Sequence, residues 1–214
     1  MNGYEILDLD DLEEVTYRGS GETLRPLRLR LGFTAFGANV WSAAEAGGKL
    51  IPPHEEQSGH EELYVVLRGR ATFTVGQETI DAPTGALLHV EAATFRTAVA
   101  AEPATMVLAV GGKEGEAFHG GGWENVHLAF ARLDAGDAAG GREVMRATIS
   151  DGEHAWGGHY NLACYEALAG NTDAAFDELR TAIDLNRDMV MNWLPHDTDL
   201  DPIRSDPRFE ELAR

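Results

Sequence analysis

The sequence contains little cysteine and few basic side chains, and both shortages narrow the range of functions that it can have. It contains one cysteine, Cys164, so the chain cannot form an internal disulfide. Cys164 lies in an apolar helical pattern, where a buried, unreactive thiol is expected. There are 17 Lys and Arg residues against 36 Asp and Glu residues, a formal net charge of −19. Because nucleic acids and anionic lipids are bound mainly through Lys and Arg, we expect neither as a partner.

The sequence also lacks long apolar runs and the motifs of several enzyme classes. No apolar run approaches the ~20 residues that a membrane-spanning helix needs. Residues 1–14 are acidic, unlike the basic and then apolar start of a secretory signal. We therefore expect a soluble, cytoplasmic protein. No nucleophile elbow, phosphate-binding loop, dinucleotide fingerprint or CxxC zinc site occurs, which removes several common enzyme classes.

The first half of the chain has the pattern of short antiparallel strands. Strands are expected where β-branched, aromatic and aliphatic residues lie between turn signals, at 27–31, 38–41, 64–67, 71–75, 80–90 and 104–110. Segment 27–31 reads Leu-Arg-Leu-Arg-Leu, and this alternation predicts leucines on one face of a strand and arginines on the other. Strands of this length and spacing predict an antiparallel sandwich or barrel.

After residue 112 the pattern changes from strands to helices. Residues 113–122 are glycine-rich and polar, so we expect a linker, and we assign His119 to it rather than to a metal site. From Trp123 onward two pairs of helices are predicted, with turns at Gly136 and Gly170. The sequence therefore predicts a first domain at 1–112, a linker at 113–122 and a helical domain at 123–214.

Positions 30–112 resemble the cupin family of small β-barrels. Four residues fall at the spacings of its first motif, with one extra residue before the glutamate: Gly48, His54, Glu62 and Gly69. Glu56 takes the place of the second histidine of that motif. In the second motif Gly85 is kept, and three residues replace its proline, glycine and last metal-ligand histidine: Glu91, Ala93 and Arg96. The resemblance implies an antiparallel jelly roll that commonly dimerises through its sheets.

The helical half resembles the tetratricopeptide repeat. Gly136 and Gly170 are 34 residues apart, the period of that repeat. The second copy is the clearer, through Leu162, Ala163, Gly170, Ala175, Leu179 and Ala182. The first copy has Gly141 where the repeat has alanine, at a cost of about 1 kcal/mol of helix stability. We expect Glu166 on a solvated acidic face, and Phe209 to pack onto the stack as a cap.

Together these patterns predict an α+β protein that resembles bacterial proteins joining a cupin domain to tetratricopeptide-like repeats. The fold class expected is an antiparallel β-barrel or jelly roll, cupin and RmlC-like, followed by an all-α domain of antiparallel helical hairpins. The helical domain is expected to contact a protein or peptide, or to form a homodimer.

The candidate ligand pocket lies inside the predicted barrel. Its residues are expected to be His54, Glu56, His60, Glu62, Tyr64, His89 and Arg96. Arg96 is permanently charged and is no metal ligand, so we expect it to form a bidentate ion pair with a neighbouring carboxylate. Such a pair favours a barrel that needs no cofactor. The alternative is a divalent transition metal ion held by His54, His60 and Glu62, with His89 available to complete the set, because residues two apart on a strand share a face.

Three functions remain open at this point, and whether the protein is an enzyme is undecided. The favoured one is a noncatalytic small-ligand-binding or regulatory module, with an anionic ligand held by Arg96. The second is a metal-dependent cupin enzyme, an oxygenase or isomerase, that uses His54, His60 and Glu62. The third is a metal-independent enzyme acting on a sugar or small acid, with His60 as general base near Tyr64 or Glu62.

Overall fold

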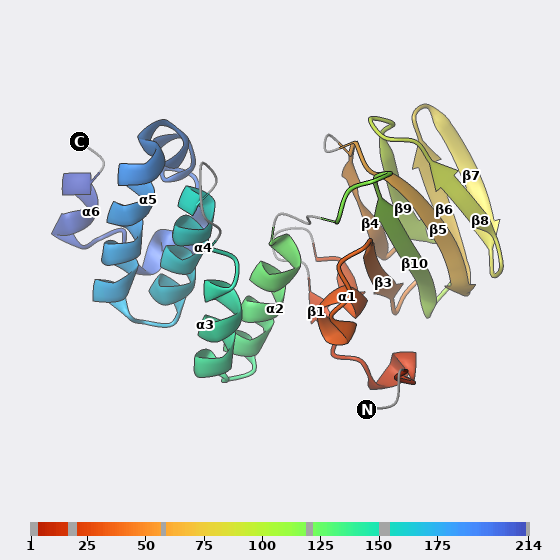
Figure 1. Cartoon of the computed structure of the whole chain (residues 1–214), viewed down its shortest axis with the longest axis horizontal. Coiled ribbons are helices and arrows are strands. Elements are labelled where there is room, and N and C mark those ends of the chain that lie inside the picture. Colours follow the sequence, from red (N-terminus) through yellow and green to blue (C-terminus); the bar gives the residue numbers. More distant parts are fainter. Residues whose placement is uncertain (1–3, 17–20, 57–58, 119–121, 150–154, 213–214) are drawn as a thin grey trace. The chain divides into compact units, whose positions relative to one another are not determined.

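The chain folds into two compact units, Met1–Gly120 and Gly121–Arg214 (Figure 1). The computed structural model describes residues 4–16, 21–56, 59–118, 122–149 and 155–212. The boundary between the units falls inside the segment predicted as a linker, and His119 lies outside the described residues. Among the helices described, none combines the length and the apolar character that a membrane crossing requires.

The first unit is a sandwich of two antiparallel sheets. One sheet contains, in spatial order, β1 (Val15–Thr16), β2 (Thr23–Arg25), β3 (Gly37–Ala43), β10 (Thr105–Gly112), β5 (Glu61–Arg68) and β8 (Leu87–Val90). The other contains β4 (Lys49–His54), β9 (Arg96–Ala100), β6 (Arg70–Val75) and β7 (Glu78–Pro83). A short 3-10 helix, η1, covers Leu9–Asp11. This arrangement confirms the predicted antiparallel sandwich.

The two sheets place alternate residues of each strand inside the sandwich, and this alternation positions the site described below. In β5, Tyr64 and Val66 are buried while Leu63 is exposed. Strand β4 lies at the edge of its sheet, next to β9 alone. The free edge accounts for only one of Pro52 and Pro53, because the amide positions of consecutive strand residues face opposite sides. The pairing of β4 with β9 is irregular between Ile51 and His54, so neither proline interrupts a regular ladder.

Segment 27–31 is a helix, α1 (Leu27–Leu31), and not the strand predicted from its alternating leucines and arginines. Leucine and arginine are both strong helix formers, so local propensity opposes the period-two pattern. Pro26 precedes the helix, and Gly32 ends it with a φ of +71°, a left-handed conformation that glycine adopts at little cost. The strand prediction is therefore wrong here.

The second unit consists of helices. They are α2 (Trp123–Asp134), α3 (Ala138–Arg146), α4 (Ala155–Leu168), α5 (Thr172–Trp193), η2 (Thr198–Ile203) and α6 (Pro207–Leu212). The predicted turns are present, with φ of +87° at Gly136 and +78° at Gly170. Helix α5 is interrupted by the non-helical backbone of Asn186, so the helix predicted near Met189 is its final part. Phe209 is buried in the helical core, as expected for the cap, while the tetratricopeptide resemblance stays a prediction.

Glu166 is buried, which corrects its assignment to a solvated face. Its carboxylate accepts two hydrogen bonds from Arg142 and one, of 2.7 Å, from the side chain of Asn171. Burial raises the pKa of Glu166, but these hydrogen bonds outweigh burial and its pKa lies below the ordinary 4.5. The ion pair therefore ties helix α3 to helix α4, and the hydrogen bond from Asn171 ties Glu166 to the turn that follows α4.

Gly141 leaves room for a neighbouring helix to approach. A Cβ atom at this position would overlap the hydroxyl oxygen of Tyr165 and lie 2.6 Å from the carbonyl oxygen of Ala129. Tyr165 is buried and donates a 2.8 Å hydrogen bond to the carbonyl of Ala138. The glycine that weakens the repeat pattern is thus required by packing.

Gly141→Ala is expected to destabilise the protein although alanine is the better helix former. The gain in helix propensity is about 1 kcal/mol, whereas overpacking a well-filled contact costs about 1–3 kcal/mol. Gly157→Ala in α4 is the matched control, because a Cβ there meets no atom within 4 Å and should be neutral or stabilising. Urea unfolding of both variants measures the difference. Equal stabilisation by both would show that Tyr165 does not constrain position 141.

Candidate functional site

The interior of the sandwich holds a cluster of charged side chains that begins with Glu62 on β5. Glu62 is paired in register with Gly111 of β10, and a Cβ at Gly111 would lie 3.2 Å from the Cγ atom of Glu62. The missing side chain at Gly111 therefore gives Glu62 its space. Tyr64, two residues further along and 1% exposed, donates a 2.5 Å hydrogen bond to the Oε2 atom of Glu62.

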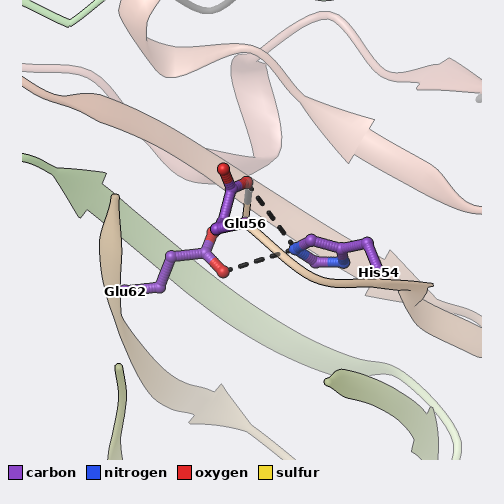
Figure 2. A group of neighbouring side chains, drawn as sticks. All are labelled: His54, Glu56 and Glu62. Atoms are coloured by element: carbon purple, nitrogen blue, oxygen red, sulfur yellow. Dashed lines mark ion pairs between the residues drawn. The ribbon is translucent and has the colours of Figure 1, made fainter. Parts of the chain in front are cut away.

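His54 and Glu56 complete the cluster (Figure 2). The Nε2 atom of His54 lies 3.4 Å from Oε2 of Glu62 and 3.8 Å from Oε1 of Glu56. Its other ring nitrogen, Nδ1, lies 2.7 Å from the carbonyl oxygen of Pro52. Because a carbonyl can only accept, Nδ1 carries a proton, and Nε2 is the atom that faces the carboxylates.

Arg96 lies at the start of β9, opposite His54 in the register of the two strands, and is fully buried. Its Nε atom is 3.3 Å from Oε2 of Glu62, and Nη2 donates a 3.0 Å hydrogen bond to the carbonyl of Glu91. The Nε contact is an ion pair without hydrogen-bond alignment, and Nη1 has no partner among the described residues. The prediction of a bidentate ion pair is therefore wrong. Two buried donor atoms of Arg96 make no hydrogen bond in the described part of the chain.

The cluster shifts the protonation of its members. Burial alone lowers the pKa of His54, but its hydrogen bonds with Glu62 and Pro52 outweigh burial and raise the pKa above 6.5. Burial raises the pKa of Glu62, but the hydrogen bonds from His54 and Tyr64 dominate and lower it below 4.5. Burial, followed by the charge of Glu62, raises the pKa of Tyr64, so its hydroxyl stays protonated.

His60 does not join His54 and Glu62 as predicted. It precedes β5, which begins at Glu61, and its ring stacks on Phe118 with centroids 5.0 Å apart. Its Nδ1 atom lies 3.9 Å from Oε2 of Glu56, so His60 lies beside the cluster. Glu56 takes the third place in the group of potential ligands, and the histidine next to Glu62 is His54.

His89 does not line the interior. It is paired in register with Leu63, so both side chains lie on the outer face of the sheet. Its Nε2 atom is 2.8 Å from Oε2 of Glu61, and both side chains are more than half exposed. The prediction of His89 as a pocket residue is wrong, because the side chains of a strand alternate and neighbouring positions point to opposite faces.

Five of the predicted pocket residues lie close to one another in the structure. His54, Glu56, Glu62, Tyr64 and Arg96 are brought together from β4, β5 and β9 and from the segment that follows β4. Phe118 was missed, because its position in a glycine-rich segment indicated a linker. An aromatic residue between polar and glycine residues was the available signal.

The donor atoms fit a divalent metal ion in type, while Arg96 opposes one. One imidazole nitrogen and two carboxylates are ligands that transition metals accept, and the bond from His54 to Pro52 is typical of the outer shell of metal-bound histidines. The guanidinium of Arg96, however, places a permanent positive charge 3.3 Å from one of those carboxylate oxygens. When His54 is protonated, its charge and that of Arg96 balance the charges of the two carboxylates.

No protein-family model matches the sequence, and no curated protein matches it. Solved structures similar to the chain include a cupin protein from Bacteroides fragilis, with 23% identity over 56% of this chain and 92% of that chain and a TM-score of 0.42. A sugar phosphate isomerase from a cupin superfamily, from Silicibacter pomeroyi, has 22% identity over 51% and 76% and a TM-score of 0.43. A predicted oxalate decarboxylase from Thermotoga maritima has 13% identity over 50% and 97% and a TM-score of 0.41. At these values the similarities carry no argument about activity.

Glu62→Gln is expected to lower the pKa of His54. The substitution removes the negative partner, and burial together with the charge of Arg96 then favours the neutral imidazole. NMR titration of the imidazole measures the pKa, which in the wild type should lie above 6.5. Glu61→Gln is the control, since Glu61 pairs with His89 on the outer face. An unchanged His54 titration in Glu62→Gln would contradict the described pairing.

Proposed function

We propose that the sandwich is a noncatalytic binding module for a small ligand that carries a carboxylate, held by Arg96. The supporting observation is the fully buried guanidinium with two donor atoms, Nε and Nη1, that make no hydrogen bond within the described residues. Leaving donors of a buried charged group unpaired costs free energy, and a ligand oxygen that accepts from them recovers that cost. Arginine is suited to this role because its planar fork matches a carboxylate.

The surrounding side chains indicate further features of the ligand. Glu56 and Glu62 are acceptors, and Nε2 of a protonated His54 is a donor, so the cluster offers both kinds of hydrogen-bonding group. With His54 protonated, its charge and that of Arg96 balance the two carboxylates, and an anion meets no net negative cluster. A ligand with one carboxylate and several hydroxyl groups, such as a sugar acid or hydroxy acid, satisfies these groups best.

Arg96→Lys is expected to weaken binding of such an acid. Lysine keeps the positive charge beside Glu62 but loses the fork, and a hydrogen bond to a charged group contributes about 1.5–3 kcal/mol, so affinity should fall about tenfold or more. Isothermal titration calorimetry with glucuronate, citrate and succinate measures the affinity. Arg68→Lys is the control, because Arg68 is exposed and paired with Asp10. Equal binding by both variants, or no binding of any acid to the wild type, would contradict the proposal.

A metal-dependent enzyme is the second candidate, and one observation favours it. The bond from Nδ1 of His54 to Pro52 turns Nε2 toward the carboxylates of Glu56 and Glu62. Elemental analysis of protein prepared without chelator or affinity tag separates the two functions. A stoichiometric metal that is lost in His54→Ala and kept in His89→Ala would replace the metal-free proposal.

We also propose that the helical unit forms a homodimer or binds a protein through α5, in line with its tetratricopeptide-like pattern. Large apolar side chains are exposed on this helix, at Leu185, Met189 and Trp193. Met189→Glu should dissociate a dimer formed through α5, as measured by sedimentation velocity. Leu87→Glu on the edge strand β8 is the comparison, because Leu87 is also exposed. Dissociation by Leu87→Glu alone would place the contact on the sheet.

A further inference from the structure

Two glycines remove side chains from the inner face of neighbouring strands at the level of Glu62. Gly111 of β10 is paired in register with Glu62 of β5 on one side and with Gly37 of β3 on the other. Residues paired in register project to the same face of a sheet. The Cβ directions of Gly37 and Gly111 therefore point to the face that carries Glu62.

The space over each glycine is filled by a different side chain. Over Gly111 lies Glu62, whose Cγ atom would be 3.2 Å from a Cβ there. Over Gly37 lies the ring of Phe118, with Cε2 and Cε1 2.6 and 3.0 Å from the position of a Cβ. Since the two glycines are neighbours, Phe118 and Glu62 occupy adjacent places on the inner face.

Phe118 is held there by contacts from several parts of the first unit. Its backbone N–H donates a 2.9 Å hydrogen bond to the carbonyl of Thr34. The guanidinium of Arg28 lies 5.6 Å from its ring centroid, and the ring of His60 stacks on it. His60, whose side chain is 12% exposed, in turn lies 3.9 Å from a carboxylate oxygen of Glu56. The chain thus returns after β10 to place an aromatic ring beside the charged cluster.

We propose that Phe118 is the gate of this site: its ring covers His60 and the inner face beside Glu62, and so limits which ligands reach Arg96. The role of Phe118 in ligand entry rests on the proposed function. Its covering of His60 rests on the contacts alone. The Gly37 seat fits the ring only while position 37 has no side chain. Removing the ring, or displacing it with a side chain at position 37, should therefore expose His60.

Chemical modification of His60 tests the cover directly. The wild type, Phe118→Ala and Gly37→Ala are treated with diethyl pyrocarbonate, and the rate of imidazole modification is followed by peptide mass spectrometry. His89, which is exposed in the same molecule, serves as the internal reference. Relative to His89, His60 should react slowly in the wild type and severalfold faster in both variants. An unchanged rate in both variants would overturn the proposal.

Phe36→Ala is the matched control for general loosening. Phe36 is exposed, adjoins Gly37 in the chain and packs on Phe33, so its removal should leave the reactivity of His60 unchanged. An increase equal to that in Phe118→Ala would overturn the gate. Circular dichroism establishes that each variant is folded, and Phe118→Leu provides a milder change should the alanine variant unfold. A slower reaction of His60 in Phe118→Leu than in Phe118→Ala supports the gate. If His60 reacts at the wild-type rate in both Phe118→Leu and Gly37→Ala, the gate is overturned.

Binding of citrate to the same variants tests the limit on ligands. If the gate limits entry, Phe118→Ala should bind citrate faster than the wild type in stopped-flow calorimetric or fluorescence measurements. Absence of citrate binding in every variant would remove the proposed ligand class, while the reactivity of His60 still decides whether Phe118 is the cover. A faster His60 reaction with unchanged citrate kinetics would overturn the role of Phe118 in ligand entry. The failures of the two proposals are thus distinguishable.

Discussion

The ion pair between Arg96 and Glu62 is the interaction on which the interior of the first unit depends. A buried cation costs several kcal/mol unless opposite charge and hydrogen bonds compensate it, and here Glu62 and the carbonyl of Glu91 supply part of that compensation. Glu62 in turn accepts from Tyr64 and faces His54, so one carboxylate links strands β4, β5 and β9. Replacing either member of the pair alone would leave the other charge buried without its partner.

The pattern of the sequence predicted the fold where local and global preferences agree. Strand β5 combines β-prone residues with a closing glycine, and the turns at Gly136 and Gly170 combine helix periodicity with residues that accept positive φ. The strand predicted at 27–31 was wrong because its alternating pattern was taken as sufficient, although leucine and arginine favour helix. The prediction that Glu166 is solvated was wrong because its partners come from another helix and from the following turn. Residue spacing along α4 does not reveal these partners.

The sequence indicated only some of the residues that gather in the interior, and it did not indicate their geometry. The resemblance to the two cupin motifs placed His54, Glu62 and Arg96 near one another. The face of His89 and the place of His60 depend on a shift of one residue, which reverses the direction of a side chain on a strand. Glycines were interpreted as turn signals, whereas Gly111 serves an interior role by making room for a neighbouring side chain.

The seat of Phe118 over Gly37 has a consequence for how this protein varies among its relatives. A side chain at position 37 and a large ring at position 118 compete for one volume, although the two positions are far apart in the sequence. A relative that gains even a methyl group at position 37 can keep the same packing only with a smaller side chain at position 118. The two positions are therefore expected to evolve as a pair, and the pairing would mark the chains that retain this closed interior.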